Sequence, residues 1–220
     1  MPLVLKFLPL TFSALLPVLN PIGSALVFLG LVGSAPSEVF RALARKIALS
    51  TALFLFTIDL AGTAILAFFG ISLPVVQFAG GFVLAAMGWS LLNQEDVAKK
   101  GLVSPSPPDT GSLEERVFYP FTFPVTAGPG CLVVMLTLSA HASQPSFIEQ
   151  VWAQAGILCG IVLISVIVYV SYAYAEKFTS KVSQQTIHGV LRVIAFILLC
   201  IGVQIAWNGL NALLRGTGKS

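Results

Sequence analysis

The sequence predicts an all-α membrane protein with six transmembrane helices, and two observations carry that prediction. Of the 220 residues, 56% are hydrophobic and 10% are charged, and the mean hydropathy is +0.92, far from the balance of a soluble domain. Apolar segments also recur at about the 20 residues that a helix needs to cross a bilayer. Six such segments cover residues 7–31, 47–70, 73–92, 118–138, 151–174 and 190–210.

A polar linker divides the chain into two halves with the same order of features. Residues 1–92 form a first three-helix repeat, 93–116 a flexible linker, 117–212 a second repeat and 213–220 a C-terminal tail. In each half a proline precedes a helix break, and an uninterrupted helix and then a helix rich in small residues follow. Three spans are an odd number, so the second repeat enters the membrane from the opposite side and the repeat is inverted.

The first span is interrupted at Asn20-Pro21-Ile22-Gly23. Asparagine is among the best helix N-caps, and proline suits the first helical position because its missing N–H would be unpaired there anyway. We therefore expect a new half-helix to begin at Asn20 and Pro21, in a break that ends at Gly23.

The fourth span is interrupted in the same way at Thr126, Gly128, Pro129 and Gly130. Two discontinuous helices at matching places in inverted repeats indicate a central transport site. Helix amino ends suit a carboxylate, and the preceding carbonyl ends suit an ammonium group or a cation, so a small zwitterion satisfies both. The alternative is that the prolines only kink two helices whose freed backbone groups are satisfied by neighbouring groups.

Other polar residues within the spans are weaker candidates. Asp59 lies deep in the second span, where it is either a proton or cation carrier or a carboxylic acid hydrogen-bonded to Thr57, Thr63 or a neighbouring helix. Gln204 and Asn208 lie four residues apart on one face of the sixth span, where they either line the pathway or form an interhelical or interfacial pair. Tyr172 is interpreted as an interface anchor.

Several classes of function are excluded by the pattern of charged and ligating residues. The net charge of +3 comes from scattered basic residues, so nucleic acid is not an expected partner. Neither the three cysteines nor the two histidines have metal-ligand spacing, and no metal or cofactor is expected. No nucleophile and base occur at usable spacing, so we expect no enzyme.

The distribution of lysine and arginine predicts the orientation in the membrane. On one side, which is predicted to be cytoplasmic, lie Arg41, Arg45, Lys46, Lys99, Lys100, Arg116, Lys177, Lys181 and Arg192. On the other lie Lys6, Arg215 and Lys219. Nine against three places the 93–116 linker in the cytoplasm and both termini outside the cell membrane.

The chain resembles the MarC family of membrane proteins over nearly its whole length apart from the linker. The residues that carry the resemblance are Asn20-Pro21-Ile22-Gly23, Phe69-Gly70-Ile71-Ser72-Leu73-Pro74 leading into Ala79-Gly80-Gly81, Pro124-Val125-Thr126-Ala127-Gly128-Pro129-Gly130, Gly202-Val203-Gln204 and Asn208-Gly209. The resemblance implies a place in the broad LysE-like group of exporters, some of whose members transport glycine, alanine and other small neutral amino acids. It also implies discontinuous first and fourth helices around a central substrate.

We therefore expect a transporter or exporter of small neutral amino acids, with the substrate at the midplane between two broken helices. The lipid bilayer, a small zwitterionic solute and a coupling proton or cation are its expected partners, and the oligomeric state is left open. Two alternatives remain: a non-transporting membrane protein with a packing or partner-binding role, and a carrier for an inorganic ion.

Overall fold

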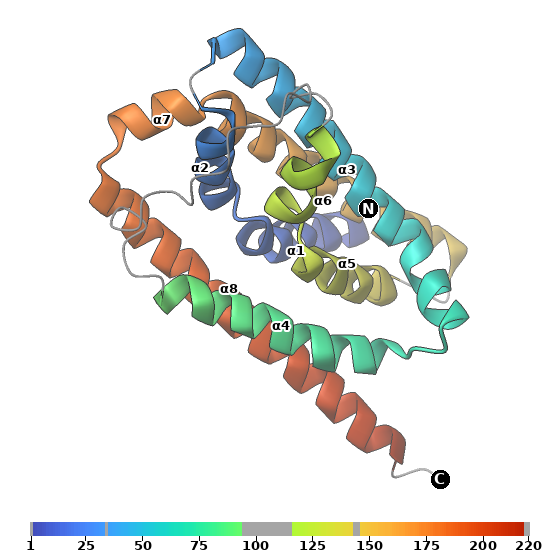
Figure 1. Ribbon diagram of the computed structural model, residues 1–220. Helices are drawn as coiled ribbons and strands as arrows, with labels where there is room; N and C mark the ends of the chain where they lie inside the picture. The colour runs from blue at the N-terminus through green and yellow to red at the C-terminus, as the bar shows by residue number, and fades with distance from the viewer. Residues whose placement is uncertain (1, 34, 94–115, 143–145, 218–220) are drawn as a thin grey trace.

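The computed structural model describes residues 2–33, 35–93, 116–142 and 146–217, and every regular element within these ranges is a helix (Figure 1). In chain order they are α1 (Pro2–Leu19), α2 (Pro21–Val32), α3 (Ser37–Phe68), α4 (Leu73–Asn93), η1 (Val117–Thr126), α5 (Pro129–Ala142), α6 (Phe147–Ala173), α7 (Ala175–Lys181) and α8 (Gln184–Thr217). The predicted all-α class is confirmed for this part of the chain. Residues 94–115 of the predicted linker and 218–220 of the predicted tail lie outside the described residues.

The described helices provide up to six membrane crossings. Five segments are long and apolar enough to cross a bilayer, namely Leu3–Val32, Ser37–Phe68, Leu73–Asn93, Phe147–Ala173 and Gln185–Arg215. A sixth crossing results if η1 and α5 are counted as one span, bent by 71°. Several helices are longer than the apolar runs in the sequence. Helix α3, for example, begins with a polar turn that contains Glu38, and an acidic residue is favourable at the amino end of a helix.

The helices are arranged as a bundle with a separate pair along one side. The bundle contains α1, α2, α3, η1, α5 and α6, while α4 and α8 lie side by side next to it (Figure 1). The bundle core is aromatic near α2, where the Phe28 ring lies 5.3 Å from Phe121 and 5.8 Å from Phe40, both edge-on. Edge-to-face packing of this kind stabilises buried aromatic rings.

Helices α4 and α8 are in backbone contact along a row of glycines. A methyl group on Gly81 would lie 2.6 Å from the Gly202 carbonyl oxygen, and one on Gly202 would lie 2.8 Å from the Gly81 carbonyl oxygen. Gly88 and Gly209 make equally close contacts further along the pair. Small residues allow membrane helices to approach until their backbones touch, which is how helices associate without a hydrophobic driving force.

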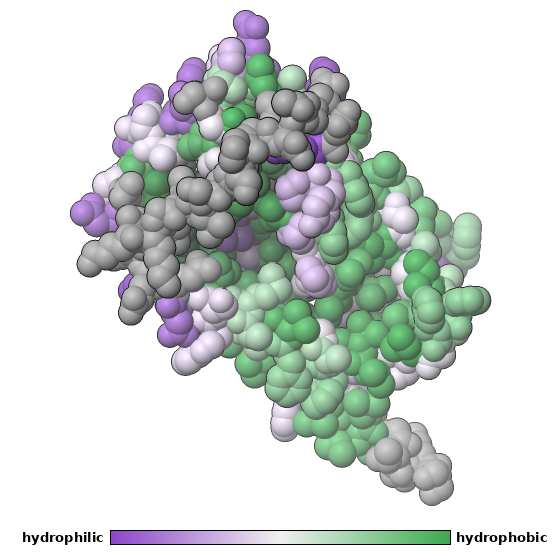
Figure 2. Space-filling view, in the orientation of Figure 1, coloured by the Kyte–Doolittle hydropathy of each residue, from purple (hydrophilic) through white to green (hydrophobic). Residues whose placement is uncertain are grey.

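The surface is divided between a hydrophilic end and a hydrophobic remainder. Hydrophilic residues gather at the end where α3 begins and α7 lies, whereas hydrophobic residues cover α4 and α8 (Figure 2). Large apolar side chains on these two helices are exposed, among them Phe82, Trp89 and Trp207. Exposure on this scale is expected where the surrounding medium is lipid.

Candidate functional site

The first break is a single residue, Asn20, between α1 and α2. Its backbone lies in the left-handed region at φ 43° and ψ 61°, which asparagine tolerates better than most residues. Its side-chain oxygen accepts a hydrogen bond from the Gly23 N–H at 3.1 Å, and Pro21 opens the new helix. The predicted N-cap at Asn20 is therefore confirmed.

The polar groups around this break are largely satisfied by their immediate neighbours. The Ser24 N–H donates to the Asn20 carbonyl at 2.9 Å, and the Ser24 hydroxyl lies 2.9 Å from that oxygen and 3.2 Å from the Leu19 carbonyl. Pro21 has no N–H, and among the described residues the Ile22 N–H has no acceptor. One free amide is thus left at this amino end, fewer than an uncapped helix offers.

The segment before the second break is an irregular helix with i→i−5 hydrogen bonds. Pro120 and Pro124 push the preceding residues, Tyr119 and Phe123, out of the helical region to ψ 126° and 125°. Threonine hydroxyls also donate to carbonyls five residues earlier in this segment. Thr122 Oγ1 donates to the Val117 carbonyl at 2.8 Å, and Thr126 Oγ1 donates to the Phe121 carbonyl at 2.6 Å.

The second break is wider than the first and bends the chain. Helix η1 ends at Thr126 and α5 begins at Pro129, as the sequence predicts for the new half-helix, with a bend of 71° between the two axes. The Cys131 N–H donates to the Gly128 carbonyl at 3.0 Å, whereas the Gly130 N–H has no acceptor among the described residues. Each break therefore places a proline first and a free amide second in the new helix.

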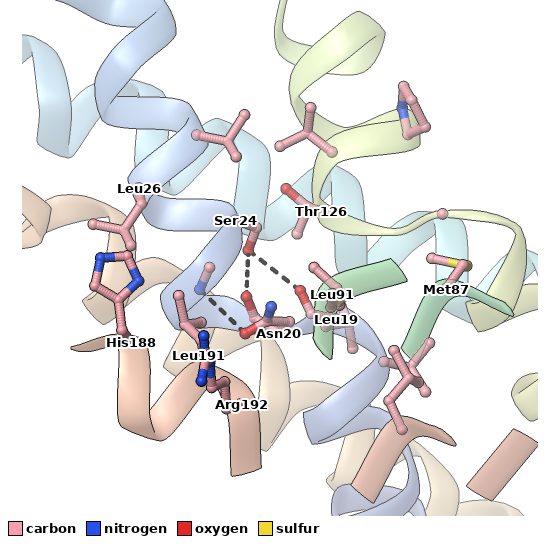
Figure 3. Close-up of a pocket in the computed structure, with 17 residues that line it drawn as sticks. Leu19, Asn20, Ser24, Leu26, Met87, Leu91, Thr126, His188, Leu191 and Arg192 are labelled. Carbon is pink, nitrogen blue, oxygen red and sulfur yellow. Dashed lines mark hydrogen bonds between the residues drawn. The ribbon is translucent and has the colours of Figure 1, made fainter. Parts of the chain in front are cut away.

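A cavity of about 370 Å³ lies between the two breaks and the α4–α8 pair (Figure 3). Four predicted site residues line it, and they are Asn20, Gly23, Thr126 and Gly128. Its remaining polar lining comes from Ser24, His188 and Arg192, and apolar side chains such as Leu191 and Met87 form the rest. The structure thus brings the two sequence motifs to one compartment.

Three of the seven residues predicted at the two breaks do not line the cavity. Pro21 is buried beside it and Pro129 is exposed elsewhere. Gly130 is buried in a helix contact, where an added Cβ would lie 2.5 Å from a Leu84 methyl and 3.1 Å from a Val18 methyl. The need for glycine at position 130 is therefore explained by packing. Its backbone N–H is still one of the free amides in the first turn of α5.

Tyr172 contacts Thr126, one of the residues that line the cavity, and its interpretation as an interface anchor is wrong. It is completely buried, its ring lies 4.7 Å from Phe28, and its hydroxyl lies 2.7 Å from Thr126 Oγ1. The aromatic character of the helix end suggested a membrane interface, but α6 turns this face inward. Nothing in the neighbouring sequence distinguishes a tyrosine at the membrane interface from one buried in the bundle.

Arg192 and His188 are the cavity residues that the sequence did not single out. Both lie in the first part of α8, which passes α2 and the Asn20 break (Figure 3). In the sequence Arg192 counts only as one of the cytoplasmic charges. Its approach to Asn20 depends on the packing of segments about 170 residues apart, which no short motif records.

Asp59 lies in the bundle interior, away from the cavity. It is 3% exposed, its Oδ2 accepts a hydrogen bond from the Gln154 side chain of α6, and its backbone carbonyl accepts one from Ser139 Oγ at 2.9 Å. Its other oxygen, Oδ1, has no partner among the described residues. The neighbouring-helix interaction that the sequence left open is present, and one acceptor remains available.

Gln204 and Asn208 are on an outer face of α8 and do not line the cavity. Gln204 Nε2 donates to Asn208 Oδ1 at 2.9 Å, and both side chains are exposed. Their four-residue spacing does bring them together, as expected for one helix face. Their position separates them from the two breaks.

These features define a multi-pass integral membrane protein in which two helix interruptions border one cavity. The profile of the MarC family integral membrane proteins matches residues 5–214, so the chain belongs to this family. It is 27% identical over 208 residues to a membrane protein of Pyrococcus abyssi, covering 94% of this chain and 96% of the relative. It is 29% identical over 221 residues to the inner membrane protein MarC of Escherichia coli, covering 96% of each chain. No solved structure matches the chain significantly.

Proposed function

We propose that this protein is a carrier, not an enzyme, and exports or otherwise transports small neutral amino acids such as glycine and alanine. The proposed location is the inner or plasma membrane, with both termini outside and the 93–116 linker in the cytoplasm. The observation that carries the proposal is the shared cavity, which Asn20 and Gly23 line from one break and Thr126 and Gly128 line from the other.

The chemistry of the cavity suits a small zwitterion. The Arg192 guanidinium provides a fixed positive charge for a carboxylate. The Asn20 side-chain oxygen and the Ser24 and Thr126 hydroxyl oxygens provide acceptors for an ammonium group. A cavity of about 370 Å³ exceeds the ~30 Å³ share of one water molecule by about tenfold, so it has room for such a solute with some of its hydration water.

We propose that the six crossings form two inverted three-helix repeats, with discontinuous first and fourth helices. The glycine contacts between α4 and α8 support this arrangement, because Gly81 and Gly88 match Gly202 and Gly209 at a constant offset of 121 residues. Gly81 contacts Gly202 and Ala206, and its counterpart Gly202 contacts Gly81 and Ala85 through the same backbone atoms. A two-fold axis between the helices would produce this exchange.

We propose that Asp59 is the coupling group for a proton or cation. Its support is the unpartnered Oδ1 in the bundle interior, since a buried carboxyl group with a spare acceptor is costly unless it binds something. Asp59→Asn should flatten the pH or cation dependence of transport while substrate still binds. An unchanged profile in proteoliposomes would assign Asp59 to packing.

The binding site is best tested with a pair of glycine substitutions. An added Cβ at Gly128 would meet only the Pro124 carbonyl oxygen, at 3.3 Å, so Gly128→Ala adds a methyl group to the cavity wall with little distortion. The matched control is Gly189→Ala on α8, where a Cβ meets nothing within 4 Å. Glycine and alanine binding to the purified protein should weaken about tenfold or more, or ~1.4 kcal/mol, in Gly128→Ala and stay unchanged in Gly189→Ala.

A second function is favoured by one observation. The side chains of Asn20 and Ser24 bond backbone groups at the first break, and the hydroxyls of Thr122 and Thr126 bond carbonyls of η1, as a purely structural kink requires. A non-transporting membrane protein would then show no thermal shift with any amino acid and no flux in liposomes. Shifts with metal salts alone would instead indicate an inorganic-ion carrier.

A further inference from the structure

The outer face of α8 carries an amide pair where the surroundings should be lipid. Residues advance by about 100° around a helix, so Gln204 lies about 200° from Gly202, which is pressed against α4. Gln204 and Asn208 therefore point away from the rest of the protein, and both are exposed. Figure 1 shows α8 at the edge of the molecule, alongside α4.

The pair lies within the membrane-spanning part of α8, which runs from Gln185 to Arg215. Along the helix axis Gln204 is about 28 Å from Gln185 and about 16 Å from Arg215, and Asn208 is one turn nearer to Arg215. The hydrocarbon core is about 30 Å thick, so the short Gln204 side chain is too far from either end of the span to reach water.

The internal hydrogen bond satisfies only half of the pair. Gln204 Nε2 donates to Asn208 Oδ1, which leaves Gln204 Oε1 as an acceptor and the Asn208 amide hydrogens as donors with no partner among the described residues. Some other exposed polar side chains in the spans bond a backbone carbonyl of their own helix, and this pair has no such bond among the described residues. Thr57, for example, is also exposed but donates its hydroxyl hydrogen to the Leu53 carbonyl of its own helix at 2.8 Å.

We propose that the α8 face formed by Val193, Ile197, Cys200, Gln204 and Asn208 is the contact between two copies of this chain in the membrane. The free acceptor and free donors on one copy complement those on a second copy, and a two-fold axis along the membrane normal lets both copies use them at once. The interface leaves the cavity untouched, because the lining residues of α8 are on another side of the helix. The proposal therefore does not depend on the transported solute.

The native cysteines provide a direct test. Cys200 lies one turn before Gln204 on the same face, Cys159 is exposed on α6, and Cys131 is buried. In liposomes of purified protein, a membrane-permeant oxidant should cross-link wild type and Cys159→Ser into dimers, and Cys200→Ser should lose the dimer band. Equal cross-linking in Cys200→Ser, or loss of the band in Cys159→Ser, would place the contact elsewhere.

A second measurement removes the amides and leaves the cysteines in place. Gln204→Leu with Asn208→Leu should raise the dimer dissociation constant about tenfold or more, measured by energy transfer between labelled copies as the lipid-to-protein ratio is increased. Thr57→Val is the matched control and should leave it unchanged. A monomeric wild type at every dilution, or association of the double variant equal to wild type, would overturn the proposal.

Discussion

The two helix breaks border the same cavity but are stabilised in different ways. The first is closed within Leu19–Ser24 by the side chains of Asn20 and Ser24. The second bends by 71° and shares its Thr126 hydroxyl with Tyr172 on α6, 46 residues further along the chain. The first break is therefore encoded locally, whereas the second depends on the assembled bundle.

This difference assigns the two breaks different parts in transport, should the proposed function hold. A locally capped break keeps its geometry when neighbouring helices move. The second break is tied to α6 by one hydroxyl pair, so a displacement of α6 against η1 would change the cavity wall at Thr126. We expect the second break to be the one that changes between conformations.

The largest expected effect comes from Asn20→Ala. Alanine loses the cap, worth about 1 kcal/mol, and is unfavourable at the positive φ, which costs roughly 1–2 kcal/mol more. The free energy of unfolding in mixed micelles should fall by about 2–3 kcal/mol. Asn20→Gly is the control: glycine accepts the positive φ, so it should lose only a few tenths of a kcal/mol. Equal losses in the two variants would show that the backbone conformation contributes nothing.

The second break should respond to Thr126→Val with a loss of about 1–3 kcal/mol. Valine has a similar shape but leaves both the Phe121 carbonyl and the buried Tyr172 hydroxyl without this partner. Thermal unfolding of the purified protein measures the effect. If Thr126→Val were as stable as wild type, the hydroxyl pair would not hold the break.

Tyr172→Phe should cost less, about 1 kcal/mol or below. It removes the phenol oxygen, yet Thr126 Oγ1 still donates to the Phe121 carbonyl, so no buried donor is stranded there. Thermal unfolding of both purified variants, measured under the same conditions, shows whether Tyr172→Phe loses less stability than Thr126→Val. A greater loss in Tyr172→Phe would mean that the tyrosine hydroxyl has further partners of its own.

The sequence predicted what depends on neighbouring residues. Asn20 before Pro21 is a cap for the same reason in a peptide as in a protein, and Pro129 likewise marks the start of α5. The spans were also predictable, because an apolar run of about 20 residues identifies a membrane-spanning helix without any knowledge of how the helices pack.

What the sequence missed depends on residues far apart along the chain. Pro120 and Pro124 are visible in the sequence, but the irregular conformation of η1, with the hydroxyls of Thr122 and Thr126 bonded to its carbonyls, is not. Tyr172 looked like an interface residue because burial is decided by which face α6 turns inward.

The smallest effect on stability, and the sharpest on ligand binding, is expected from Arg192→Gln. Arg192 is exposed and its side chain has no hydrogen-bond or ion-pair partner among the described residues, so the free energy of unfolding should change by no more than about 0.5 kcal/mol. Its charge nevertheless faces the cavity between Asn20 and α8, so binding of a carboxylate-bearing solute should weaken about tenfold or more. Arg215→Gln, on the same helix but outside the cavity, should bind like wild type. Equal binding in the two variants would show that Arg192 does not hold the carboxylate.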